Sequence, residues 1–293
     1  MPISQVILKA CQKLQKFNLS SAFLDAELLL SFVLRKPREY VLAHPEIKLT
    51  KKQILKFYKL IAQRAKNIPL AYLTGVKEFY GREFYVDKRV LVPRPETETL
   101  IEQVKSEKLK MKSDAIIVDI GTGSGCIIIT LAKELENLKS KISNLKFLAT
   151  DVSLGALAVA KKNARLHGVA DKIKFMRGNL LEPILKNRTL VTYNLLFVAN
   201  LPYLMPTQIK NSPTIKHEPL LALSAGKDGL KYYRQLANQL QQFNIKYPNI
   251  SISLFCEIDP EQSKAIKKIF SLAKSMEIKK DLAGRNRLFI ARF

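Results

Sequence analysis

Apolar residues near the amino end of the chain recur every three or four positions. Over Ile3–Leu14 this spacing places them on one face of a helix. A second helix is expected after Ser20 or Ser21, whose hydroxyls can cap it, and a third over about Lys51–Ala65 after Thr50. The first 75 residues are therefore predicted to form a small helical bundle, which we interpret as a module for substrate recognition.

Short aromatic runs replace this helical spacing in residues 76–98. Aromatic residues on both sides of Gly81 predict a β-hairpin that joins the bundle to the rest of the chain. The segment Val92–Glu98 reads Val-Pro-Arg-Pro-Glu-Thr-Glu, and its two prolines restrict the backbone. A rigid segment with an arginine and two glutamates suits the wall of a pocket. The alternative is a stiff linker whose end starts a helix over Leu100–Glu107.

Residues 99–293 alternate between apolar runs typical of buried strands and amphipathic runs typical of helices. This alternation predicts an α/β domain with a doubly wound sheet. The predicted strands are 116–120, 145–150, 172–177, 193–199, 250–258 and 287–293, and the predicted helices are 124–138, 153–167, 230–243 and 262–275.

A glycine-rich turn follows the first of these strands. Ile116–Gly125 reads Ile-Ile-Val-Asp-Ile-Gly-Thr-Gly-Ser-Gly, a buried strand and then a loop whose glycines allow a sharp turn and a close approach to a ligand. The next strand ends at Asp151, where a carboxylate can bind the two hydroxyls of a ribose. These two features leave NAD, FAD and S-adenosylmethionine open as ligands.

Charge and composition change this interpretation only in part. The net charge of +24, from 49 basic and 25 acidic residues, favours a polyanionic neighbour such as RNA, but a lysine-rich composition explains it equally well. The three cysteines and three histidines have no spacing typical of a disulfide framework or a metal site, so we expect no metal. No run approaches the roughly 20 apolar residues that span a bilayer. We expect a cytoplasmic monomer with no membrane partner.

The most specific chemistry follows the strand 193–199, in the sequence Asn200, Leu201, Pro202, Tyr203. An amide or exocyclic amine nitrogen is a poor nucleophile because its lone pair is delocalised. To be methylated, it needs acceptors for its N–H groups while the nitrogen faces an electrophilic methyl group. The Asn200 side-chain oxygen and the Leu201 carbonyl supply such acceptors, Pro202 stiffens the turn, and Tyr203 offers a flat wall.

The glycine loop and this tetrapeptide together resemble Rossmann-like methyltransferases that act on nitrogen. The longer pattern resembles the peptide chain release factor glutamine methyltransferase family and covers nearly the whole chain. The matching segments are Pro69–Gly75, Glu78-Phe79, Leu91–Glu98, Asp119–Gly125, Asn200–Tyr203, Glu218-Pro219, Ala222-Leu223, Gly226, Asp228–Leu230, Glu257-Ile258, Gln262 and Asp281–Arg285.

The resemblance implies a seven-stranded methyltransferase domain that transfers a methyl group from S-adenosylmethionine. The acceptor is the side-chain amide of the glutamine in the Gly-Gly-Gln motif of class 1 release factors. The implied cofactor-binding residues are Gly121, Thr122, Gly123, Gly125, Asp151, Asn179, Leu180 and Asn200. The implied substrate-binding residues are Arg94, Glu96, Glu218 and the tetrapeptide Asn200, Leu201, Pro202 and Tyr203, which is also the catalytic set.

Two departures from the family pattern bear on this prediction. Leu201 stands where the family usually has proline, and Asn-Leu-Pro-Tyr also resembles the adenine dimethylases of rRNA. Asn179 stands where the family tends to have aspartate, although its side-chain oxygen can still accept a hydrogen bond from an adenine amino group. The alternatives are therefore an adenine N6-methyltransferase acting on RNA or DNA, and a non-catalytic RNA-binding factor with a methyltransferase fold.

Overall fold

The computed structural model describes residues 1–110, 114–136, 145–186 and 194–293. The chain divides into two compact units. The first, which we call the helical unit, comprises Met1–Val76 with Ser212–His217, and the second, the α/β unit, comprises Lys77–Asn211 with Glu218–Phe293.

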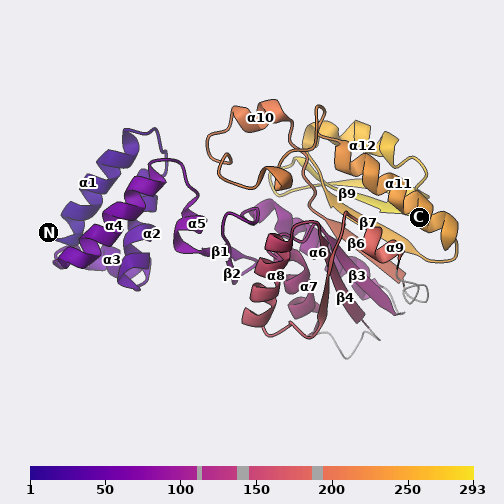
Figure 1. Cartoon of the computed structure of the whole chain (residues 1–293), viewed down its shortest axis with the longest axis horizontal. Coiled ribbons are helices and arrows are strands. Elements are labelled where there is room, and N and C mark those ends of the chain that lie inside the picture. Colours follow the sequence, from indigo (N-terminus) through magenta and orange to yellow (C-terminus); the bar gives the residue numbers. More distant parts are fainter. Residues whose placement is uncertain (111–113, 137–144, 187–193) are drawn as a thin grey trace. The chain divides into compact units, whose positions relative to one another are not determined.

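The helical unit packs its helices around one apolar core. The residues that recur on one face between Ile3 and Leu14 are all buried, as their spacing predicts. Thr50 caps the fourth helix reciprocally: its hydroxyl accepts from the Gln53 N–H at 3.2 Å, and the Gln53 side chain accepts from the Thr50 N–H at 2.9 Å. The helices are α1 Ile3–Gln15, α2 Ala22–Leu34, α3 Arg38–Ala43, α4 Lys51–Arg64 and α5 Leu70–Thr74 (Figure 1).

The predicted cap of the second helix is wrong in its contact, although Ser21 does precede α2. The Ser21 hydroxyl donates to Asp25 Oδ2 at 2.9 Å and accepts nothing from the helix backbone. Its backbone, at φ −93° and ψ 20°, lacks the extended conformation that lets Thr50 cap α4. The same Asp25 oxygen accepts from Arg64 Nε at 2.7 Å, so a buried ion pair ties α2 to α4.

The predicted hairpin is present as β1 Val76–Phe79 and β2 Arg82–Tyr85. Its turn residues Tyr80 and Gly81 both have positive φ, 52° and 67°, which is the geometry of tight hairpin turns. After it, a 3₁₀ turn at Pro95–Thr97 leads directly into helix α6, so the rigid segment and the start of a helix are both features of this stretch. Helix α6 runs over Glu98–Lys110.

The α/β unit is built on a seven-stranded sheet in the order β5-β4-β3-β6-β7-β9-β8. The strands β3 to β7 are mutually parallel, and β9 is antiparallel to both of its neighbours. The chain leaves β3 toward β4 on one side and returns to β6 on the other, which makes the carboxyl edge of β3 and β6 a topological switch point. The strands are β3 Ala115–Ile120, β4 Leu145–Asp151, β5 Ile173–Arg177, β6 Asn194–Ala199, β7 Ile252–Glu257, β8 Ser275–Lys280 and β9 Asn286–Arg292.

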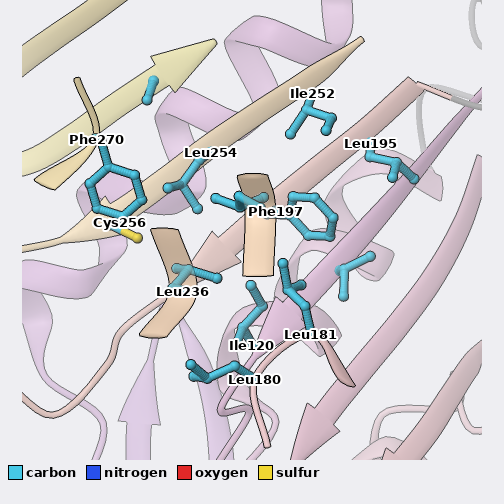
Figure 2. Packing of buried hydrophobic residues seen from close by; sticks show 14 of the residues in the cluster. Ile120, Leu180, Leu181, Leu195, Phe197, Leu236, Ile252, Leu254, Cys256 and Phe270 are labelled. Atoms are coloured by element: carbon cyan, nitrogen blue, oxygen red, sulfur yellow. The ribbon is translucent and has the colours of Figure 1, made fainter. Parts of the chain in front are cut away.

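Helices cover both faces of this sheet, and the central strands are buried throughout (Figure 1). Alternate residues of β3 enter different cores: Ile116 and Val118 pack with Phe197 on one face, and Ala115 and Ile117 pack on the other. Figure 2 shows the first of these cores, with Phe197 and Leu254 of the sheet beside Leu236 of α11. The helices are α7 Cys126–Glu136, α8 Leu154–Leu166, α9 Glu182–Leu185, α10 Pro206–Lys210, α11 Lys231–Lys246 and α12 Ser263–Ile269.

One strand was not predicted from the sequence pattern. The expected helix 262–275 is α12 alone, which ends at Ile269, and β8 follows it before the closing strand β9. The apolar positions Met276 and Ile278 alternate with charged residues in this edge strand, a weak signal that the predicted helix obscured. Residues 137, 138 and 193, to which a predicted helix and a predicted strand extend, lie outside the described residues.

Candidate active site

The glycine loop lies at the switch point, directly after β3. Gly121 and Gly123 have φ of 73° and 55°, the left-handed region that favours glycine. The N–H groups of Gly121 and Thr122 both donate to the Thr150 carbonyl at 2.9 Å. These hydrogen bonds attach the loop to the end of β4, at the carboxyl edge of the sheet.

Asp151, the last residue of β4, is the second anchor of this loop. Its Oδ2 accepts from the Gly123 N–H at 2.9 Å, and its Oδ1 accepts from the Ser153 N–H at 2.8 Å. Burial raises the pKa of this carboxyl group, while these backbone bonds oppose the rise. Each carboxylate oxygen keeps a second lone pair, so Asp151 can hold the loop and still accept from a ligand hydroxyl.

Gly125 serves helix packing rather than lining the cavity. Its φ is 80°, and a Cβ atom on it would lie 2.8 Å from Ile129 Cδ1 and 3.2 Å from Ala160 Cβ. Helices α7 and α8 can approach each other here only because residue 125 has no side chain. This close approach sets the direction in which α7 leaves the loop.

Asp119 is fully buried beneath the loop. Its Oδ2 accepts from the Thr122 hydroxyl at 2.6 Å, and its Oδ1 has no hydrogen-bond partner in the part of the chain that the structure describes. Burial raises the pKa of Asp119 to about 7, and the nearby charge of Asp151 acts in the same direction. The protein therefore maintains a second titratable carboxyl group directly behind the residues expected to hold the cofactor.

A strained turn after β5 brings Asn179 and Leu180 to the same edge. Leu180 has a φ of 50°, which is unusual for a residue with a branched side chain. The turn is held by the Thr150 hydroxyl, which donates to the Leu180 carbonyl at 3.0 Å, and by Gln239 of α11, which accepts from the Leu181 N–H at 2.7 Å. Helix α11 thus takes part in shaping this end of the cavity.

Asn200 follows β6 and has its side-chain amide nitrogen fully engaged. The Nδ2 group donates to Glu257 Oε2 at 2.9 Å and to Thr97 Oγ1 at 3.0 Å. The Thr97 hydroxyl in turn donates to Glu257 Oε2 at 2.6 Å. Glu257 is 2% exposed, and burial raises its pKa. Because both Asn200 N–H groups have acceptors, the Oδ1 atom is the group left to receive a donor.

Of the remaining residues of the tetrapeptide, Leu201 and Pro202 line the cavity, whereas Tyr203 packs against the apolar core and is not part of the lining. The Leu201 side chain is 2% exposed and belongs to the apolar core beside Ile120, so this position takes an apolar side chain as packing. The Tyr203 hydroxyl donates to Glu257 Oε1 at 3.5 Å, and burial raises its pKa. The Tyr203 carbonyl accepts from Gln262 Nε2 at 3.0 Å, which braces the far end of the turn.

The predicted substrate-binding charges have different surroundings. Glu218 is buried; its Oε2 accepts from the Val92 N–H at 2.9 Å, and its Oε1 pairs with Arg94. The glutamate therefore holds the proline-rich segment in place, while Arg94 lines the cavity itself. Glu96 is exposed at the start of the 3₁₀ turn.

One cavity brings most of the predicted residues together at the carboxyl edge of the sheet. Its lining comes from the loop after β3, the ends of β4 and β5, the turn after β6 and the proline-rich segment. Among the predicted site residues, the lining includes Gly121, Thr122, Gly123, Asp151, Asn179, Leu180, Asn200, Leu201, Pro202 and Arg94.

Several contributors to this site were not assigned a role from the sequence. The sequence pattern indicates only a helix start at Thr97, and Glu257 belongs only to one of the segments that match the family. The available signal for Glu257 is its position, since it is the acidic residue that ends the apolar strand β7, Ile252–Glu257, just as Asp151 ends β4. Thr97 is part of the lining, whereas Glu257 lies behind it. The other lining residues are Arg89, Val90, Leu91, Pro93, Ser124, Cys126, Ile127, Val152, Ser153, Ala156, Gly178, Pro219, Leu221, Ala222 and Tyr232.

Two family profiles match consecutive parts of the chain. The profile of the PrmC N-terminal domain matches residues 5–75, and that of N-6 DNA methylases matches residues 89–224. A release factor glutamine methyltransferase of Clostridium acetobutylicum is 30% identical over 99% of this chain and 98% of its own. The chain belongs to the release factor glutamine methyltransferase family. The family member from Dictyoglomus turgidum is 39% identical over 82% of this chain and 81% of its own.

Some relatives that match this chain are longer proteins. A bifunctional methyltransferase of Rickettsia felis is 37% identical over 98% of this chain, which spans only 57% of that protein's length. Among solved structures, the catalytic domain of hMettl16 in complex with a MAT2A 3′UTR hairpin has a TM-score of 0.53 at 17% identity, covering 80% of this chain and 81% of that one. This likeness confirms the predicted α/β methyltransferase fold. Across the described residues, no helix is both long and apolar enough to cross a membrane.

Proposed function

We propose that this chain methylates the side-chain amide nitrogen of the glutamine in the Gly-Gly-Gln motif of class 1 release factors, using S-adenosylmethionine. The observation that carries the proposal is the orientation of Asn200, whose Nδ2 is bound by Glu257 and Thr97 so that its Oδ1 can receive a donor. The similarity to release factor glutamine methyltransferases over nearly the whole chain supports the substrate.

The residues around the cavity fit S-adenosylmethionine by their chemistry. Asp151 has lone pairs for ribose hydroxyls, and Asn179 has a side-chain oxygen for an adenine amino group. The glycine loop Gly121–Gly125 allows the backbone to come close to the ligand. When bound, S-adenosylmethionine supplies an electrophilic methyl group on a sulfonium.

The turn after β6 orients the acceptor. Asn200 Oδ1 and the Leu201 carbonyl accept hydrogen bonds from the glutamine amide. This fixes the nitrogen in line with the methyl group, so most of the acceleration comes from orientation and from polar groups placed in advance. A general base is not required, because the nitrogen can lose its proton after methyl transfer.

The helical unit and the hairpin supply a surface for the release factor in this proposal. We assign residues 1–75 to recognition, residues 76–98 to a linker whose end forms part of the cavity wall, and residues 99–293 to methyl transfer. The formal charge of +24 favours work beside the ribosome, where release factors and RNA meet. We propose that the chain acts there as a monomer.

Adenine N6-methylation is the second candidate. The match to the N-6 DNA methylase profile over residues 89–224 and the Asn-Leu-Pro-Tyr sequence at Asn200–Tyr203 favour it. An exocyclic amine needs the same two acceptors as an amide, so this end of the site serves either acceptor. The PrmC N-terminal domain and the full-length relatives favour the release factor.

A competition assay distinguishes these candidates. The purified chain is incubated with methyl-labelled S-adenosylmethionine and equal amounts of release factor and rRNA, and both are then analysed for label. We expect label in the release factor alone. Label in adenine alone would replace the proposal with the second candidate, and label in neither, with no cofactor binding by calorimetry, would favour a non-catalytic RNA-binding factor.

A further inference from the structure

Glu257 is a buried carboxylate next to the reacting end of the site, and the mechanism above gives it no contact with substrate. It ends β7, the parallel neighbour of β6, and the register pairs Ala199 with Cys256. Asn200, which follows β6, and Glu257, which ends β7, therefore lie at the same point of the carboxyl edge of the sheet. The sheet order alone places this carboxylate beside Asn200, although the two residues are 57 positions apart.

The hydrogen bonds around Glu257 leave one orientation for the Asn200 amide. A carboxylate only accepts hydrogen bonds, so the atom of Asn200 that faces Glu257 Oε2 at 2.9 Å is the nitrogen. The Thr97 hydroxyl donates its hydrogen to the same Glu257 oxygen at 2.6 Å. Thr97 Oγ1 can therefore only accept a hydrogen bond from Asn200, whose Nδ2 lies 3.0 Å away. Turning the amide over would set its oxygen against two acceptors.

Stability alone gives little reason for this arrangement. Removing a carboxylate from water is expensive, and Glu257 is 2% exposed. The neighbouring charge of Arg287 and the hydrogen bond from Thr97 offset the cost only in part, and the pKa of Glu257 stays above its ordinary value. A buried polar network that is costly and specific in direction is expected where orientation matters for function.

We propose that Glu257 and Thr97 are positioning residues that lock the Asn200 amide with Oδ1 toward the acceptor. The inference rests on the proposed function, in which Asn200 Oδ1 receives an N–H of the methylated group. The Pro-Arg-Pro-Glu-Thr-Glu segment thereby has a role in catalysis, because the Thr97 hydroxyl completes the hydrogen bonds that hold the Asn200 amide. We call these three hydrogen bonds among Asn200, Thr97 and Glu257 the lock. Thr97 lines the cavity and Glu257 does not; in this proposal both act by orienting Asn200 rather than by binding the substrate.

The kinetic test uses Thr97→Val, which keeps the shape of the side chain and removes its hydroxyl. We expect kcat to fall about 10–100-fold, less than the 10²–10³-fold loss typical of removing a direct polar partner. We expect the KM for release factor to stay within about twofold, because this bond orients Asn200 without binding substrate. Thr97→Ser, which keeps the hydroxyl, should restore kcat.

Two controls show whether Thr97 acts through Asn200. Thr130 is a fully buried threonine in α7 whose hydroxyl has no hydrogen-bond partner in the described parts of the chain, so Thr130→Val tests the same substitution away from the site. It should leave kcat unchanged. In an Asn200→Ala background, Thr97→Val should cost nothing further, because the group it orients is already gone. An equal loss in both backgrounds would overturn the proposal.

A measurement without substrate separates this inference from the proposed function. The side-chain amide signals of Asn200, assigned by their loss in Asn200→Ala, report hydrogen exchange by NMR. We expect slow exchange in the wild type and in Thr130→Val, and at least about tenfold faster exchange in Thr97→Val. If the wild type methylates no release factor but this pattern holds, the proposed function fails and the lock stands. Equal exchange in all three proteins refutes the lock.

Discussion

Gly125 offers a test of how the loop and the helix after it are built. With φ at 80°, an alanine at this position takes the left-handed conformation, and its Cβ lies 2.8 Å from Ile129 Cδ1 and 3.3 Å from Ala160 Cα. The Ile129 methyl group can rotate away, but the Ala160 backbone belongs to helix α8 and cannot move without the helix. Gly125→Ala must therefore strain its own backbone or push α8 from α7.

The cost of this substitution separates into two parts. A left-handed conformation costs an alanine about 1–2 kcal/mol, and overpacking a dense interior adds about 1–3 kcal/mol. Gly168 isolates the first part, since its φ is 67° and a Cβ there would have no neighbour within 4 Å. The gain from restricting the unfolded chain is the same for both substitutions. We therefore expect Gly125→Ala to lower the free energy of unfolding by about 1–3 kcal/mol more than Gly168→Ala.

Urea denaturation followed by circular dichroism measures the difference between the two variants. Calorimetric titration with S-adenosylmethionine provides the second readout. Gly125→Ala should also weaken cofactor binding because it displaces the loop, whereas Gly168→Ala should leave the affinity unchanged. Equal unfolding free energies for the two variants would falsify the packing argument, because they would mean that the space beside Ala160 has no energetic role.

Two further predictions concern buried charges. Burial raises the pKa of Asp119 from 3.8 to about 7, so the folded protein keeps a proton that the unfolded chain releases; stability should fall as pH rises from about 4 to 7, by up to roughly 4 kcal/mol at 1.36 kcal/mol per pKa unit. Asp119→Asn should remove this slope in urea titrations at pH 5 and 8, and an unchanged slope would contradict the assignment. Arg64→Met should lower the free energy of unfolding by about 3–5 kcal/mol, because it leaves the buried Asp25 carboxylate without its ion-pair partner. The matched Arg234→Met, at an ion pair about half exposed on both sides, should cost at most about 1 kcal/mol, and equal losses in thermal unfolding would refute the distinction.

The parts of the site that the sequence predicts are those defined by local pattern. An apolar strand followed by glycines, by Asp151 or by Asn200 places polar groups at the carboxyl edge of a parallel sheet, whatever the rest of the chain does. The structure brings these groups to one cavity for that reason. The helical spacing over Ile3–Leu14 is equally local, and its apolar face is buried as expected.

The parts that were not predicted depend on which strands become neighbours. Glu257 lies 57 positions from Asn200 and meets it because β7 pairs with β6. Thr97 lies 103 positions away and meets it because the proline-rich segment lines the same cavity. The positive φ of Leu180 has no local signal either, since no glycine marks it, and contacts from Thr150 and α11 hold the turn. Strand β8 was missed because an edge strand with one half-buried face carries a weak alternation.

The position of the methyl group in the product tests the proposed function most directly. The chain is incubated with S-adenosylmethionine and a class 1 release factor, and the peptide containing the Gly-Gly-Gln motif is fragmented by mass spectrometry. We expect one methyl group on the side-chain amide of the glutamine, formed about 10²–10³-fold more slowly by Asn200→Ala. An unmodified glutamine, or an equal rate in the variant, would contradict the proposed function.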